Sequence, residues 1–207
     1  SKWTPLCQIS VTERTSPTNV SRAVYQDGDA RTGIPAAGGE GVAFPPYTLK
    51  KDPRVLIIGT GGGWDVHMAL SGGASHITGA EINPVTLGVC KNPEYNVLAD
   101  SFNANPNIEL NNAEGRFFVR SNDTKYDIIQ MSGVDTYTAL SSGAYVLSES
   151  YLYTKDAFED YFDHLTDDGI VSITRFTFPV PRECLRVMVM ACEVLAERGA
   201  EKPLSLI

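Results

Sequence analysis

Residues Val55–Pro84 read VLIIGTGGGWDVHMALSGGASHITGAEINP, and this stretch decides the fold. The aliphatic run Val55–Ile58 stops at a glycine, as expected of a parallel strand that is buried on both faces. We expect a glycine-rich turn over Gly59–Gly63, a helix over Trp64–Ser71, and a second strand that ends at Glu81. The stretch therefore predicts a strand–turn–helix–strand unit, with its turn at the carboxyl end of the first strand.

The turn suits a ligand that contains a nucleoside. Gly59, Gly61 and Gly63 carry no side chains, so the backbone there can adopt positive φ and approach a ligand closely. Glu81 lies 18 residues after Gly63, where an acid accepts hydrogen bonds from ribose hydroxyls. Trp64 stands where a dinucleotide site has its third glycine. The pattern looks instead like the first motif of class I S-adenosylmethionine-dependent enzymes.

Further strands and helices alternate after this unit, which predicts a Rossmann-like, doubly wound, mainly parallel α/β sheet over residues 51–207. We expect the later strands at Ile108–Asn111, Tyr126–Met131 and Ile170–Arg175, with the start of a sixth at Leu204–Ile207. We expect helices at Val85–Cys90, Asp156–Leu165 and Arg182–Arg198, the last apolar on nearly all sides and therefore well buried. Such a sheet usually continues further, so we expect the chain to be truncated at its C-terminus.

Residues 1–50 predict a small β-hairpin appendage followed by a loop. Gln8–Glu13 alternates apolar and polar residues like a half-exposed strand, and Val20–Tyr25 predicts another. Asp27–Gly28 is a favoured turn dipeptide, so we expect the chain to reverse there. The segment Gly33–Pro46 is rich in glycine, proline and alanine, which predicts a loop.

The amino-acid composition limits which binding partners and which cellular compartment we expect. The net charge of −8 disfavours a nucleic-acid partner, and no apolar run approaches the ~20 residues of a membrane span. The four cysteines lack paired spacing, which fits a reducing compartment such as the cytoplasm. His67, His76 and His164 form no ligand pattern, so we expect no metal site.

Two later blocks resemble the spermidine (polyamine) synthases, which belong to the class I S-adenosylmethionine-dependent methyltransferase superfamily. The first is AEGRFFVR, in which Glu114 is followed by glycine and then aromatic residues in a short helix. The second begins with YDIIQMSGVDTY and continues through LYTKDAFEDYF to DGI. The resemblance covers about Trp3 to Ile207 and is greatest to a bacterial spermidine-synthase-like branch, several of whose members are fused to membrane-spanning segments.

This resemblance implies transfer of an aminopropyl group from decarboxylated S-adenosylmethionine to a small-molecule amine. Glu81 would then hold the ribose and Glu114 would face the adenine, while Asp135 would anchor or deprotonate the amine. Asp65, Ser132 and Tyr137 are the expected substrate-binding residues, of which Asp65 could bind a cationic group and Tyr137 could wall the substrate cleft. The resemblance also implies a homodimer formed through the β appendage, and a cytoplasmic protein or the cytoplasmic domain of a membrane protein with its fused membrane segment outside this chain.

Two departures from the family pattern keep other functions open. Ser132 stands where the synthases have the aspartate that takes a proton from the amine, and a serine cannot act as that base unaided. Gly62 stands where they have an acid near the aminopropyl group. One alternative is methyl transfer from S-adenosylmethionine, whose carboxylate an acid at this position would repel. Another is a non-catalytic, regulatory nucleoside-binding domain.

Overall fold

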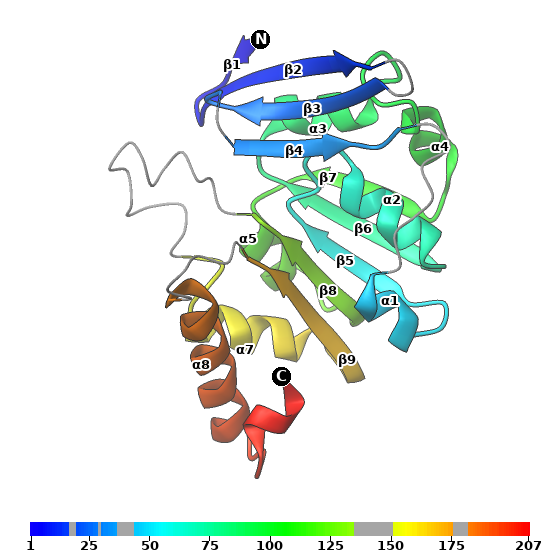
Figure 1. Cartoon of the computed structure of the whole chain (residues 1–207). Coiled ribbons are helices and arrows are strands. Elements are labelled where there is room, and N and C mark those ends of the chain that lie inside the picture. Colours follow the sequence, from blue (N-terminus) through cyan, green and yellow to red (C-terminus); the bar gives the residue numbers. More distant parts are fainter. Residues whose placement is uncertain (17–19, 29, 37–43, 135–150, 176–181) are drawn as a thin grey trace.

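The structure, a computed structural model, describes residues 1–16, 20–28, 30–36, 44–134, 151–175 and 182–207 (Figure 1). These described residues form two sheets. A four-stranded antiparallel sheet is formed near the N-terminus, and a five-stranded parallel sheet with helices follows it. The expected mainly parallel α/β fold with an N-terminal β appendage is confirmed.

The parallel sheet has the strand order β7-β6-β5-β8-β9. Its strands are β5 (Arg54–Ile58), β6 (His76–Glu81), β7 (Ile108–Asn112), β8 (Tyr126–Ser132) and β9 (Leu165–Thr174). The chain first proceeds outward from β5 through β6 to β7, and then crosses to β8 on the other side of β5. The strand order therefore reverses at the carboxyl ends of β5 and β8, which is where open α/β sheets bind ligands.

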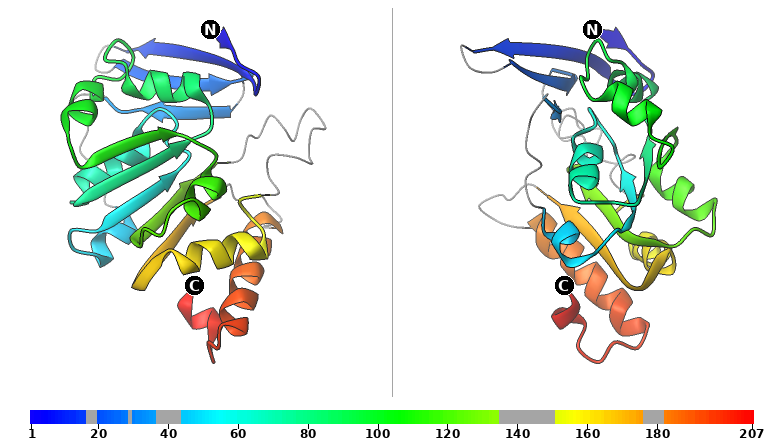
Figure 2. Two further views of the ribbon diagram at one scale, coloured as in Figure 1. Left: turned by 180° about the vertical axis from the view of Figure 1, so that it is seen from behind. Right: turned by 90° about the vertical axis from the view of Figure 1, so that its right-hand side faces the viewer.

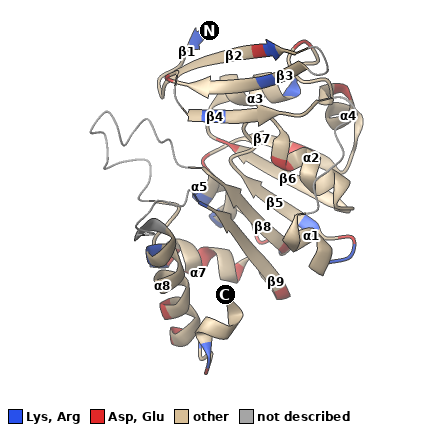
Figure 3. Ribbon diagram, viewed as in Figure 1, with Lys and Arg blue, Asp and Glu red and all other residues tan. Residues whose placement is uncertain are grey.

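Helices cover both faces of this sheet (Figure 2). On one face Val55 and Ile57 pack with Val66 of α2 (Trp64–Ser71) and Phe102 of α4 (Ala99–Ala104). On the other face Leu56 and its neighbours pack with α5 (Gly115–Arg120), α7 (Lys155–Asp163) and α8 (Arg182–Glu197). Because alternate residues of β5 enter opposite cores, the strand is apolar from Val55 to Ile58 after the exposed Arg54. Figure 3 shows charged residues mainly at strand ends and on helices.

The N-terminal sheet packs against the parallel-sheet part of the chain. Its strands are β1 (Lys2–Trp3), β2 (Gln8–Thr15), β3 (Val20–Gln26) and β4 (Ala30–Ile34), and β3 and β4 pair on either side of the predicted Asp27–Gly28 turn. Ile9, Val24 and Ile34 form an apolar cluster with Val89 of α3 (Pro84–Lys91). The Arg22 guanidinium adds hydrogen bonds to the carbonyls of Glu94 and Tyr95, at 3.3 and 3.2 Å. Both apolar and polar contacts thus fix this sheet over α3.

The expected loop Gly33–Pro46 is wrong at both ends. Gly33 is paired with Ala23 inside the β3–β4 ladder, so the strand continues through it. Pro45 and Pro46 open a short helix, α1 (Pro45–Leu49), because the first helical positions need no N–H donor. Residues 37–43 lie outside the described part of the chain. Helix α4 was not expected either; buried Phe102 anchors it within a mostly polar segment.

The C-terminal predictions need three corrections. The strand expected at Ile170–Arg175 begins earlier, at Leu165, and passes Asp167–Gly169 with an irregularity, because Tyr126 pairs with Leu165 but Ile128 pairs with Ile170. Helix α8 is amphipathic rather than buried on all sides. Its Leu185 and Val189 are 53% and 54% exposed, because the core covers only the stripe containing Val187, Met190, Ala191 and Val194. The strand start expected at 204–207 is instead part of a 3₁₀ helix, η1 (Pro203–Leu206), which has Pro203 at its first turn, where no N–H donor is needed.

Candidate functional site

The glycine-rich turn has the backbone that its sequence predicts. Gly59, Gly61 and Gly63 have φ values of 79°, 52° and 93°, which side-chain-bearing residues rarely adopt. The N–H of Gly59 donates to the carbonyl of Ala80 across 2.8 Å, and that of Gly63 donates to the carbonyl of Thr60 across 2.9 Å. The turn is thus held between β5, β6 and the start of α2.

Strand β4 of the N-terminal sheet lies directly against this turn. A Cβ atom at Gly61 would lie 2.8 Å from the Thr32 hydroxyl oxygen, and one at Gly62 would lie 2.7 Å from the carbonyl oxygen of Gly33. Such distances are too short for any side chain. The absence of an acid at Gly62 therefore has a local cause, which is that β4 occupies the space where its side chain would begin.

Glu81 ties the glycine turn to the end of β6. One carboxylate oxygen, Oε2, accepts a hydrogen bond from the N–H of Gly61, and Oε1 accepts one from the N–H of Asn83, both across 2.9 Å. The side chain is buried, and this burial raises its pKa above the usual range, although the two N–H donors oppose the shift. The predicted ribose-binding acid thus also fixes the turn.

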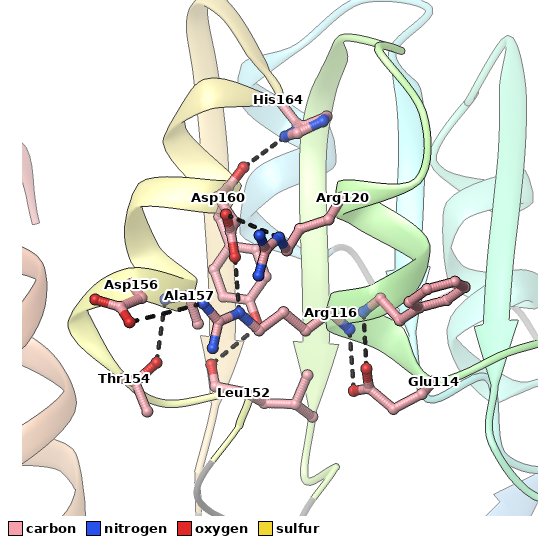
Figure 4. A network of polar contacts seen from close by, with 11 residues as sticks. Glu114, Arg116, Arg120, Leu152, Thr154, Asp156, Ala157, Asp160 and His164 are labelled. Carbon is pink, nitrogen blue, oxygen red and sulfur yellow. Dashed lines mark hydrogen bonds and ion pairs between the residues drawn. The ribbon is translucent and has the colours of Figure 1, made fainter.

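Glu114 caps the N-terminus of α5, at the carboxyl edge of the sheet after β7. Its two carboxylate oxygens accept hydrogen bonds from the N–H groups of Arg116 and Phe117, at 3.0 and 2.7 Å (Figure 4). The Arg116 side chain forms a 2.7 Å ion pair with Asp160 of α7. Next to the cap, Phe117 is 70% exposed. Glu114 is therefore rigidly placed beside an open aromatic ring.

A buried polar network brings Asp65 and Ser132 together, which are two of the three predicted substrate-binding residues. Asp65, in the first turn of α2, is 9% exposed and is hydrogen-bonded to the side chains of Ser132 and Gln130 on β8. Burial raises the pKa of Asp65 to about 6, while these two hydrogen bonds oppose the shift. Gln130 Nε2 donates to Ser132 Oγ across 3.2 Å, and the Tyr47 hydroxyl on α1 donates to Gln130 Oε1.

Sequence reasoning missed Tyr47 and Gln130. A signal for Gln130 was present, because a glutamine inside the apolar strand Tyr126–Met131 requires buried hydrogen-bond partners. No local pattern names Tyr47 as the partner, since it lies 83 residues away along the chain.

The predicted catalytic residue Asp135 and the predicted substrate residue Tyr137 lie outside the described residues. The structure does place the chain that leads to them. Val134 Cγ1 lies 2.9 Å from the position of a Cβ atom at Gly59. Val134, the last described residue before Asp135, therefore lies over the start of the glycine turn.

Two further findings concern only the described ranges. No group of three or more His, Cys, Asp or Glu side chains there could hold a metal ion. No helix there is long and apolar enough to cross a membrane.

His164 contacts the carbonyls of Asp160 and Asn122 through its two ring nitrogens, at 2.6 and 2.8 Å, so it links α7 to the segment before β8.

Comparison with known proteins supports the resemblance seen in the sequence. A polyamine aminopropyltransferase from Alkaliphilus oremlandii is 27% identical over 129 residues, which cover 62% of this chain and 42% of that protein. The crystal structure of spermidine synthase from Thermotoga maritima matches with a TM-score of 0.57 and 17% identity, over 89% of this chain and 62% of that one. The chain has a spermidine-synthase-like fold.

This spermidine-synthase-like fold is of the class I methyltransferase type. A ribosomal protein L11 methylase from Lactobacillus delbrueckii subsp. bulgaricus matches it with a TM-score of 0.50 and 17% identity, over 72% of this chain and 65% of that one. No protein-family model matches the sequence. The chain spans less than half the length of the curated relative and about three fifths of the Thermotoga structure.

Proposed function

We propose that the protein transfers an aminopropyl group from decarboxylated S-adenosylmethionine to a small amine. The observation that carries this proposal is the position of Glu81, a buried acid hydrogen-bonded to Gly61 at the point where the strand order of a spermidine-synthase-like sheet reverses. The similarity to a protein named polyamine aminopropyltransferase supports this reaction over others of the same fold.

The residues present fit an adenosyl ligand. Each carboxylate oxygen of Glu81 accepts one backbone hydrogen bond, which leaves acceptor capacity for ribose hydroxyls. Glu114 likewise keeps spare lone pairs, which would accept from the adenine amino group beside the open face of Phe117. The turn from Gly59 to Gly63 exposes only backbone to such a ligand.

The bound sulfonium compound would supply an electrophilic carbon and a good leaving group. The protein would therefore mainly position the amine and keep it neutral, because a protonated amine has no lone pair for attack. We assign the anchoring or deprotonation of the amine to Asp135. A homodimer formed through the N-terminal sheet, where Trp3 is 73% exposed, is a further part of this proposal. So is a cytoplasmic location, either as a cytoplasmic protein or as the cytoplasmic domain of a membrane protein whose fused membrane segment lies outside this chain.

Incubation of the purified protein with labelled decarboxylated S-adenosylmethionine and putrescine should yield labelled spermidine and methylthioadenosine. Asp135→Asn should keep cofactor binding in a calorimetric titration but lose turnover. Lack of transfer to putrescine and to every longer polyamine tested would overturn the proposal. If cofactor binding persisted in that case, the non-catalytic, nucleoside-binding alternative would be favoured.

Methyl transfer from S-adenosylmethionine is a second candidate, which the surroundings of Gly62 favour. A Cβ atom at Gly62 would lie 2.7 Å from the carbonyl oxygen of Gly33, so the turn cannot carry the acid that would repel a carboxylate. The two cofactors differ only by that carboxylate. Calorimetric titration with each should show tighter binding of the decarboxylated form if aminopropyl transfer is the reaction, and the reverse for methyl transfer.

A further inference from the structure

The hydrogen bonds around Ser132 have a defined direction. The Tyr47 hydroxyl donates to Gln130 Oε1, because an amide oxygen can only accept. This leaves Gln130 Nε2, with its two hydrogens, to donate to Ser132 Oγ and to Asp65. Since Ser132 Oγ accepts from Gln130, the serine's own proton is available for the Asp65 carboxylate. The chain of donors thus runs from Tyr47 through β8 to Asp65.

Ser132 and Asp65 differ in solvent exposure, and this difference gives them different roles. Ser132 is half-buried at the carboxyl end of β8, beside the point where the strand order reverses. Asp65 is 9% exposed behind it. Ser132 is thus the more exposed of the two hydrogen-bonded residues, so an amine at this edge of the sheet would contact the serine oxygen, with the Asp65 carboxylate one hydrogen bond further in.

We propose that Asp65, acting through the Ser132 hydroxyl, receives the proton that the substrate amine must lose before it attacks. This inference rests on the proposed aminopropyl transfer and names the proton path of that same site, so that, of the two tasks proposed for Asp135, anchoring of the amine is the one that remains. Ser132 touches the amine, and Asp65 is a positioning residue that acts through it. The pair supplies from two elements, α2 and β8, the base that a serine alone lacks.

The proton transfer is balanced. The ammonium group donates an N–H to Ser132 Oγ and gives up that proton, while the proton already on Oγ moves to the Asp65 carboxylate. The products are a neutral amine, an unchanged serine and a carboxylic acid at Asp65. Burial makes Asp65 a stronger base than an exposed aspartate. The burial of Tyr47, and after it the nearby charge of Asp65, raise the pKa of Tyr47, which stays protonated as a donor.

The test compares Asp65→Asn and Ser132→Ala with the wild type in the aminopropyl-transfer assay. Each should lower kcat about 100-fold or more while the cofactor Kd changes less than about twofold. The acid limb of the pH profile of kcat/KM, near pH 6 in the wild type, should be lost in Asp65→Asn. Asp100→Asn, which changes an exposed acid in the first turn of α4, is the matched control and should behave as wild type.

A rescue experiment separates proton transfer from folding. Ser132→Asp added to Asp65→Asn places a carboxylate at the exposed position, and it should restore kcat at least tenfold with an acid limb at lower pH. Because Ser132→Ala breaks the same path without altering α2, it also tests the inference if Asp65→Asn does not fold.

Three outcomes would overturn the inference. If both single variants kept the kcat and the acid limb of the wild type, the proton path would be overturned, while the transfer reaction would stand. Failure of the rescue, with both single variants folded and impaired, would reduce Asp65 to a structural residue. No transfer by the wild type with any amine would overturn the proposed function, and the proton path with it.

Discussion

The backbone N–H of Gly61 donates to Oε2 of Glu81 across 2.9 Å, so the acid at the end of β6 holds the glycine turn at the end of β5. The same carboxylate accepts from Asn83, which caps α3. One buried side chain therefore sets the relative position of the turn, β6 and α3.

Glu81→Gln should weaken both stability and ligand binding. Its amide would turn an N–H₂ group toward a backbone N–H donor, and a buried donor left unsatisfied costs about 1–3 kcal/mol. Urea unfolding should show that loss, and calorimetry should show at least about tenfold weaker binding of the adenosyl cofactor. Glu109→Gln, on the exposed side of β7, is the control. Equal behaviour of the two variants would contradict the role of Glu81.

Gly62→Ala should destabilise the contact between the two sheets. The added Cβ would meet the carbonyl oxygen of Gly33 at 2.7 Å and a side-chain carbon of Ile34 at 2.9 Å, so β4 must shift. We expect a loss of about 1–3 kcal/mol in the free energy of unfolding. Gly88→Ala, inside α3 with open space at its Cβ position, should instead add about 0.5–1 kcal/mol. A neutral Gly62→Ala would show that β4 does not press on the turn.

Asp65 should make the stability of the protein fall as the pH rises. Burial raises the pKa of Asp65 from 3.8 to about 6, so the folded protein holds this proton more tightly than the unfolded chain. Between about pH 4 and pH 6, the free energy of unfolding of the wild type should therefore fall relative to Asp65→Asn, by about 3 kcal/mol in all. Chemical denaturation at several pH values would measure this, and a constant difference would refute it.

Asp160→Asn should loosen the attachment of α5 to α7. The side chains of Arg116 and Asp160 are 15% and 21% exposed, respectively, and Arg116 Nε lies 2.7 Å from Asp160 Oδ2. Loss of the charge should cost about 1–2 kcal/mol, because the guanidinium keeps only a neutral acceptor. Glu197→Gln, in an exposed pair with Lys155, should cost much less, because water screens that pair. If thermal melts showed similar losses of stability for Asp160→Asn and Glu197→Gln, burial would not be the reason why the Arg116–Asp160 pair is stronger.

The parts of the fold that local patterns encode were predictable. The aliphatic run of β5, the glycines with positive φ and the acid at Glu81 each follow from constraints on one short stretch. The parts that depend on distant contacts were not. The strand at Gly33 exists because Ala23 pairs with it, and the exposed side of α8 follows from which residues the core reaches.

The candidate site divides in the same way. The sequence identified Asp65 and Ser132 separately, but their hydrogen bond depends on how α2 packs on β8. Tyr47 was not identified because α1 lay in a segment whose prolines and glycines predicted a loop. Asp135 and Tyr137, which rested on the family resemblance, stay predictions.

The packing of β4 on the glycine turn also constrains how this protein can evolve. The carbonyl of Gly33 fills the space that a side chain at Gly62 would need, so the two positions are epistatic. A mutation that brings a carboxylate to Gly62 would be deleterious until another change had moved the backbone of β4. Because Gly33 has no side chain, no single substitution there can remove the obstruction. Acquisition of an acid at Gly62 would therefore require changes in both sheets.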